Sequence, residues 1–233
     1  MKAISGKLAL LIICVFASSK SQATVGFYNL SISPGDNLIA DQFDNSPNNT
    51  LDNVLTTGVA AGSTFSQWDP AANGLLPLST YNGSSWSIDY AFGPNGVGGV
   101  LNSPSNTTVT FAGSVVNLNA FGTNLVYTFT PPARGPGTYL LGLAAPLSGA
   151  TFQEIVGRAP NIGDSVSSLD GSTQIYTTTT FNGLVWNNGT PSLAVGQADF
   201  FTLVAAPEPT MIALAGAGAA TLLIFRRRNS QAR

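Results

Sequence analysis

An internal repeat limits the possible fold more than any other feature of this sequence. Residues 81–86 (YNGSSW) match residues 181–186 (FNGLVW), and Pro34-Gly35 with Leu38-Ile39 matches Pro136-Gly137 with Leu140-Leu141. Asn-Gly between aromatic or β-branched residues indicates a β-hairpin, because both residues accept positive φ. The flanking aromatic residues are then expected to pack across two adjacent strands. The repeat predicts two tandem copies of a small β unit.

The segments between the turns are typical of an all-β protein. Residues 51–56 and 151–157 are expected to be short helices or turns. Elsewhere short β-branched or aromatic runs alternate with Gly, Asn, Ser, Thr and Pro. The predicted fold is two small β-sandwich or barrel-like repeats, at 24–115 and 116–206. Strands are predicted at 25–32, 85–91, 107–112, 125–130, 138–143, 174–181 and 199–204.

Charge is distributed unevenly along the chain. Residues 24–206 contain two arginines, no lysine and ten acidic residues, for a net charge of −8, whereas the whole chain carries −2. Nucleic-acid binding needs a basic face, so nucleic acid is excluded as a partner. The same charge opposes docking of this region on anionic lipid.

The residue types that carry most catalysis are missing. The chain has no His, and its single cysteine, Cys14, lies in an apolar run near the N-terminus. Ser-His and Cys-His nucleophiles and His/Cys zinc sites are therefore excluded. We expect no enzyme activity and no cofactor. A carboxylate-dependent hydrolase stays open as a third reading, although no carboxylate pair is marked in the sequence.

The N-terminus has the layout of a signal peptide. Lys2 and Lys7 precede an apolar run at 8–17, and Ser21-Gln22-Ala23 offers small residues before a cut. Ten apolar residues span only about 15 Å as a helix, which is too short for a membrane anchor. Residues 1–23 are therefore predicted to form a cleaved signal helix, and the exported part begins at Thr24.

The last 27 residues, 207–233, have three parts. Pro207-Glu208-Pro209 disfavours helix. Residues 211–225 carry no charge, and Arg226, Arg227 and Arg228 follow directly. Fifteen residues rise about 22 Å as a helix, which allows a thin membrane span with snorkelling arginines. The positive-inside rule places the tail 226–233 in the cytoplasm.

This combination resembles the PEP-CTERM sorting signal. In that family the Pro-Glu-Pro motif, a short apolar helix and a basic end are recognised by exosortase, a membrane-embedded protease that cuts near the motif. The resemblance implies export by a bacterium that often makes exopolysaccharide. It implies an ectodomain in the periplasm, anchored in the inner membrane by the C-terminal helix, that then moves to the cell surface or extracellular matrix. It says nothing about the activity of residues 24–206.

Two weak sites stand out in the predicted ectodomain. Asp36, Asp41 and Asp44 cluster near Asn37 and Asn45, and oxygen ligands suit Ca²⁺, but the spacing matches no EF-hand and a solvated acidic loop explains it as well.

Aromatic residues form the second candidate, because exposed rings stack on sugars. Trp68 is the candidate for sugar stacking, whereas Tyr81/Trp86 and Phe181/Trp186 are expected in the core because they recur in both copies. The leading functional hypothesis is a structural or adhesive surface protein. The alternative is a module that binds exopolysaccharide.

Overall fold

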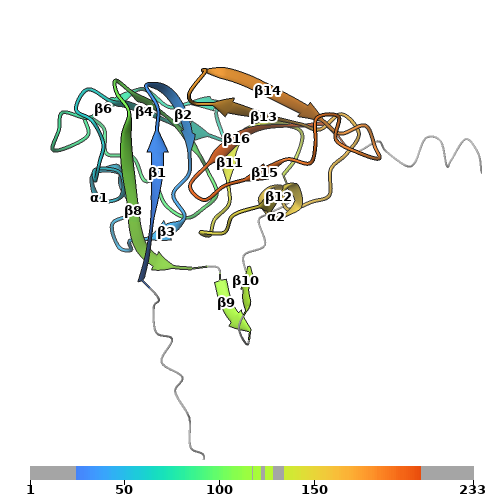
Figure 1. Cartoon of the computed structure of the whole chain (residues 1–233), viewed down its shortest axis with the longest axis horizontal. Coiled ribbons are helices and arrows are strands. Elements are labelled where there is room, and N and C mark those ends of the chain that lie inside the picture. The colour runs from blue at the N-terminus through green and yellow to red at the C-terminus, as the bar shows by residue number, and fades with distance from the viewer. Residues whose placement is uncertain (1–24, 117, 122–123, 128–133, 206–233) are drawn as a thin grey trace, which may run out of the picture.

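The computed structural model describes residues 25–116, 118–121, 124–127 and 134–205, with backbone only for 118–121 and 124–127. The described chain consists mainly of antiparallel strands with two short helices (Figure 1), which confirms the all-β prediction. The predicted signal helix and C-terminal helix lie outside the described residues.

Two sheets make up the N-terminal half. Both are antiparallel, and the short helix α1 (Leu51–Val54) accompanies them. The first contains, in spatial order, β2 (Gly35–Ile39), β7 (Gly99–Ser103), β4 (Thr64–Asp69) and β5 (Gly74–Leu75), with β6 (Ser79–Thr80) also on β4. The second contains β1 (Val25–Ile32), β8 (Thr107–Val115) and β3 (Phe43–Asp44).

Aromatic packing fills the space between these two sheets. Tyr28 stacks on Phe43 and on Phe111, with both pairs of ring centroids 5.1 Å apart. Alternate residues of β8, including Val109 and Phe111, point into this core because successive side chains of a strand face opposite sides. Phe65 of β4 enters from the opposite sheet, so one core joins the two layers.

The C-terminal half contains one main sheet, and a short helix with a short strand pair packs on it. Its spatial order is β11 (Gly137–Gly142), β16 (Ala198–Leu203), β13 (Ser165–Asp170) and β14 (Ile175–Thr180). The cover is α2 (Phe152–Val156) with the short pair β12 (Ala150–Thr151) and β15 (Ser192–Leu193). A separate hairpin, β9 (Leu118–Phe121) with β10 (Asn124–Tyr127), projects away from both halves (Figure 1).

Helix α2 begins and ends with strong local signals. Thr151 and Glu154 form a reciprocal capping box at its first turn, and Gly157 ends it in the left-handed conformation at φ 83°. Phe152, Ile155 and Val156 are buried against the sheet. The short-helix prediction for this segment is therefore confirmed, as it is for α1.

The two main sheets share one strand order and one register. In the N-terminal half Thr64 pairs with Thr80 on one side and with Asn102 on the other. In the C-terminal half Ser165 pairs with Thr180 and with Thr202. Strand β2 therefore corresponds to β11, β7 to β16, β4 to β13 and β6 to β14.

Both predicted Asn-Gly turns are present, but each is closed by a single β-bridge and no second strand follows it. Tyr81 bridges Trp86 and Phe181 bridges Trp186, with ring centroids 5.2 and 5.4 Å apart. The turn chemistry differs from the expectation: Gly83 and Gly183 have φ of 100°, but neither asparagine has positive φ. Asn82 instead acts through its side chain, which accepts from the backbone N–H groups of residues 84 and 85. Asn182 does the same for 184 and 185, so the Asn is selected for its hydrogen bonds.

Strand β14 has its outer edge closed by the same chain. Asn187 exchanges two hydrogen bonds with the backbone of Thr180, through its own N–H and its side-chain oxygen. Asn188 donates from Nδ2 to the carbonyl of Thr178 at 2.9 Å. These contacts leave less free backbone at an edge that could otherwise pair with another strand.

The strand predicted at 85–91 is wrong. Residues around Trp86 are held by side chains: the Trp86 N–H donates to Asp52, and Ser79 Oγ bonds both the N–H and the carbonyl of Ile88. Side-chain partners replace a strand ladder here, so an apolar run alone misled the prediction.

Candidate functional site

The sorting motif lies beyond the described part of the chain. Pro207, Glu208 and Pro209, and Arg226, Arg227 and Arg228, all fall outside the described residues. Within the described residues no helix is both long and apolar enough to cross a membrane. The sorting residues therefore stay predictions from sequence.

Trp68 does not form an exposed platform for sugar, so that prediction is wrong. Its side chain is only 7% exposed and meets the ring of Phe200 edge-on, with centroids 5.9 Å apart. Its indole Nε1 is buried without a hydrogen-bond partner. Phe200 lies in β16, 132 residues away in sequence, so no local pattern around Trp68 could have indicated this contact.

The three aspartates of the calcium candidate have separate roles. Asp44 accepts from Ser46 and Asn49, and these bonds lower the pKa of its carboxyl. Asp41 is buried, which raises its pKa to about 7. Asp36 accepts from Asn102 Nδ2 at 2.7 Å. In the described ranges no three acidic, His or Cys side chains are grouped as metal ligands, so the three carboxylates do not assemble a calcium site.

The core prediction for the recurring aromatics is confirmed for the first pair and only partly for the second. Tyr81 and Trp86 are buried, and the Trp86 indole donates to the carbonyl of Leu55 at 2.7 Å. Phe181 and Trp186 are half-buried, and Trp186 packs on Phe152 of α2. Neither pair offers an open aromatic face of the kind that a sugar-stacking site uses.

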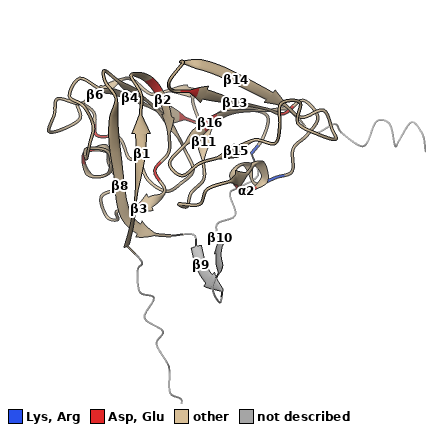
Figure 2. Cartoon of the chain, in the orientation of Figure 1, with Lys and Arg blue, Asp and Glu red and all other residues tan. Residues whose placement is uncertain are grey.

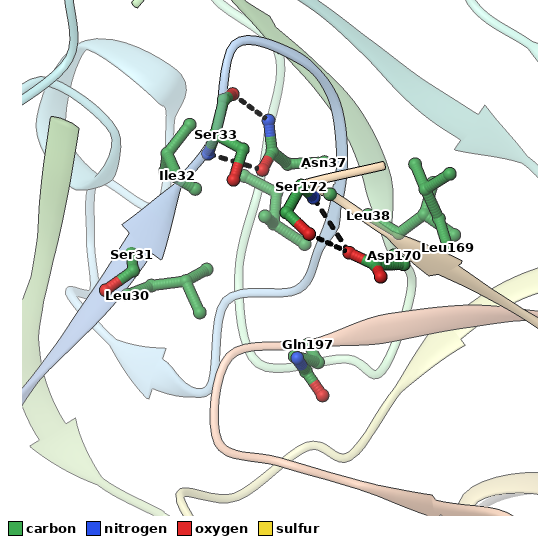
Figure 3. Close-up of a pocket in the computed structure, with 12 residues that line it drawn as sticks. Leu30, Ser31, Ile32, Ser33, Asn37, Leu38, Leu169, Asp170, Ser172 and Gln197 are labelled. Atoms are coloured by element: carbon green, nitrogen blue, oxygen red, sulfur yellow. Dashed lines mark hydrogen bonds between the residues drawn. The ribbon is translucent and has the colours of Figure 1, made fainter. Parts of the chain in front are cut away.

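One hollow, the junction groove, lies between the two halves. It has a volume of about 260 Å³ and is bounded by the end of β1, by β2 and by the turn after β13 (Figure 3). Leu30, Leu38 and Leu169 supply apolar walls, and Gln197 lies below them.

The polar rim of the junction groove is mostly used by the fold itself. Asn37 bonds the N–H and carbonyl of Ser33, and Asp170 accepts from Ser172 Oγ and N–H (Figure 3). Those bonds lower the pKa of Asp170. The groove therefore holds one ionised carboxylate in a setting fixed by its own turn.

A second hollow, the Pro77 groove, lies on the outer face of the N-terminal sheet. Its volume is about 520 Å³, within the range of small-molecule sites. Leu78, 65% exposed, and Leu75 provide apolar walls. Asp36 and Asn102 form its polar side, where the carboxylate accepts from the amide. Thr64 and Ser66 also line this groove.

A β-bulge creates the Pro77 groove. Trp68 pairs with Leu75 and Phe65 pairs with Ser79, so three residues, 76–78, lie opposite two of β4. Pro77 cannot donate to the ladder, and an extra residue bends the strand away from its neighbour. In the C-terminal half the equivalent strand β14 pairs without interruption from Ile175 to Thr180. The groove is thus a property of the N-terminal half alone.

Each groove contains a single carboxylate, Asp170 or Asp36, and no cationic side chain. Figure 2 shows the arginines of the described chain elsewhere, beside α2. Glycoside hydrolysis normally uses two carboxyl groups facing the scissile bond, and neither groove offers a pair. Hydroxyl, amide and apolar groups suit the binding of an uncharged, hydroxyl-rich ligand.

No family model, no curated protein and no solved structure matches this chain.

Proposed function

We propose that this chain is an exported bacterial surface or matrix protein with a structural or adhesive role, processed at its C-terminus by an exosortase-like membrane protease. The tail carries the proposal: Pro207-Glu208-Pro209, an uncharged run at 211–225 and Arg226–Arg228 follow in order. The tail is preceded by an acidic, cysteine-free β domain, which suits a passive extracellular module.

The end of the described chain is held firmly close to the motif in sequence. Val204, three residues before Pro207, donates its N–H to Asp164 at 2.8 Å. Arg158 binds the same carboxylate through two N–H groups, at 2.7 and 3.1 Å. Asn161 donates its backbone N–H to Asp164 as well. This arrangement fixes the domain up to Val204, so a protease acting at the motif works beside a rigid body.

The test is intact-mass measurement of the protein released from cells that encode an exosortase-like protease. We expect a product that begins near Thr24 and lacks Arg226–Arg228. Glu208→Ala should retain the tail and stay with the membrane fraction, whereas Gln231→Ala, outside the motif, should be processed normally. A released product that still contains Arg228 would overturn the proposal.

We further propose that residues 24–115 and 116–206 are tandem copies of one β-sandwich-like unit. The common strand order, the common register and the two equivalent hairpins support this. The proposed boundary falls at the end of β8, whose last residue is Val115. Strands β1, β8 and β3 then belong to the first copy, where they replace the helix-based cover of the second.

A second candidate function, binding of a neutral polysaccharide, is favoured by the Pro77 groove. The groove combines exposed leucines with an Asp–Asn pair, and it lacks a cationic group that would select an acidic sugar. Trp68 no longer contributes, because it is buried.

The fold supplies a matched control for this site. Thr138 and Thr202 occupy the positions equivalent to Asp36 and Asn102, and their hydroxyls lie 3.2 Å apart. Binding to the host exopolysaccharide, measured by affinity electrophoresis, should fall about tenfold or more in Asp36→Ala/Asn102→Ala. Thr138→Ala/Thr202→Ala should bind like the wild type. Equal binding by all three proteins would eliminate this groove as the site.

A further inference from the structure

Two backbone hydrogen bonds between the halves form a pair of equivalent contacts. The N–H of Ala40 donates to the carbonyl of Gly196 at 2.9 Å, and the N–H of Gly142 donates to the carbonyl of Gly96 at 3.1 Å. Since β2 corresponds to β11 and β7 to β16, Ala40 is the counterpart of Gly142 and Gly96 is the counterpart of Gly196. Exchanging the two halves therefore converts each of these hydrogen bonds into the other.

The strand bridges between the halves follow the same rule. Ile39 bridges Gln197, and Val97 bridges Leu141. Ile39 is the counterpart of Leu141, and Val97 is the counterpart of Gln197. Each bridge contains one of the two hydrogen bonds above, so the two bridges form one exchanged pair. This is the arrangement of an isologous, two-fold interface.

At the centre of this interface each residue faces its own counterpart. A Cβ on Gly98 would lie 2.7 Å from the Cβ of Ala198, and a Cβ on Gly142 would collide with the Cβ of Ala40. Distances under 3.0 Å cannot be accommodated without movement of one partner. Each central pair therefore consists of one glycine and one alanine, and each half contributes one of each.

This matching discriminates between partners. Two N-terminal halves packed in the same way would place Ala40 against Ala40, which is too close, and Gly98 against Gly98, which leaves a gap. Two C-terminal halves would collide at Ala198 and leave a gap at Gly142. Only an N-terminal half with a C-terminal half fills both positions, because close packing penalises overlap and voids alike.

Apolar side chains surround the central pairs and supply the driving force. Trp68 packs on Phe200, and their counterparts Leu169 and Val100 belong to the same cluster. The two-fold relation therefore matches a pair of rings with a pair of smaller aliphatic side chains. Leu38 and Leu140, which are counterparts, complete the cluster. Burial of these side chains drives association, while the glycine–alanine pairs select the partner.

We propose that the face of the N-terminal half around Ala40 and Gly98 is a selective recognition surface for the C-terminal half, and that it rejects a second N-terminal half. The partner it fits is residues 137–203 of the same chain. This inference is independent of how the tail is processed.

The test uses the full ectodomain with a protease site inserted in 128–133, cut only after folding. Native mass spectrometry and gel filtration then report which halves remain together. We expect the two cut halves to stay associated one to one. Halves that separate at micromolar concentration would overturn the proposal.

Variants of the cut protein test the selectivity. Gly98→Ala should raise the dissociation constant about tenfold or more, and adding Ala198→Gly should recover most of the loss. Gly135→Ala is the control, because a Cβ there meets nothing within 4 Å. Circular dichroism before cutting shows whether each variant is folded. A double variant no better than Gly98→Ala would refute the matching.

Ala40→Gly tests the rejection of like halves. The substitution removes the overlap that blocks a dimer of two N-terminal halves. Native mass spectrometry should therefore detect this dimer in the cut Ala40→Gly protein. It should not appear in the cut wild type. N-terminal pairs in the wild type, or none in the variant, would each contradict the proposed selectivity.

Discussion

The same sheet occurs in both halves, but its fourth strand is continuous in one half and broken in the other. Strand β14 pairs with β13 over six residues, whereas the equivalent segment forms β5 and β6 around the bulge at 76–78. The bulge opens a groove on the first sheet, while the second keeps a flat face of Ser and Thr hydroxyls, among them Thr138, Ser167, Thr178 and Thr202. One added residue and one proline are enough to convert a closed surface into a hollow.

The halves also differ at two buried positions that occupy equivalent places. Asp164, which forms the ion pair with Arg158, corresponds to Ser63, whose hydroxyl is buried without a partner. By strand register, the pair Phe65 and Gly99 corresponds to the pair Val166 and Asp199. In the first half the absence of a side chain at Gly99 leaves room for the Phe65 ring. The sheet tolerates either solution, provided that volume and polar groups are matched across strands.

The largest effect is expected at the ion pair. Asp164→Ala leaves the Arg158 guanidinium without its carboxylate and removes the acceptor of Asn161 and Val204, at an expected cost of about 3–5 kcal/mol in the free energy of unfolding. Ser63→Ala removes a buried hydroxyl that has no partner, so it should leave stability unchanged or raise it by about 1 kcal/mol. Urea unfolding of both variants makes the comparison; equal losses would show that the two positions are not energetically different.

The next effect concerns pH. Burial raises the pKa of Asp199 from 3.8 to about 7, although a hydrogen bond from Ser168 opposes the shift. Because the folded pKa lies above the unfolded one, stability is greatest below about pH 4 for this group and is lost as pH rises through 7. By linkage the loss is up to about 4 kcal/mol.

Asp199→Asn should flatten that part of the pH dependence, and Asp41, with its pKa also raised to about 7, should account for most of the slope that remains. Thermal unfolding between pH 4 and pH 8 gives the profile for wild type and variant. A wild-type melting temperature that rises from pH 5 to pH 8 would have the wrong sign for two buried acids.

A smaller effect is expected in the core of the first half. Gly99→Ala places a methyl group against the Phe65 ring and should cost roughly 2 kcal/mol through overpacking. Phe65→Val reproduces the solution of the second half, so the double variant should lose less than the sum of the two single variants by about 1 kcal/mol or more. Chemical denaturation of the three proteins measures this coupling, and strict additivity would disprove it.

The smallest effect on stability, but a large one on shape, is expected from deleting Pro77. Two residues would then lie opposite Ser66 and Gln67, as Thr177 and Thr178 lie opposite Ser168 and Ser167. The free energy of unfolding should change by no more than about 1 kcal/mol. Hydrogen exchange of the backbone amides should slow along the segment that now forms β5 and β6, because it would pair with β4 without interruption. Any polysaccharide binding at the Pro77 groove should be lost.

Local signals predicted much of this fold. The Asn-Gly hairpins, the short helices and strands such as 174–181 were recognisable from turn residues and β-branched runs. Strands β4 and β13 were missed because Ser, Gln and Asp interrupt their apolar pattern. The contact between the halves depends on Gly98, Gly142 and two alanines, which carry no hydrophobic signal. The Pro77 groove depends on a one-residue difference in pairing that only the strand register shows.

The closed edge of β14 has a consequence for concentrated solutions. Asn187 and Asn188 bond the outward backbone of Thr180 and Thr178, so another molecule that extended the sheet at this end of the strand would have to displace these bonds. That requirement opposes the growth of fibrils from a strand rich in threonine when copies of the chain are crowded together.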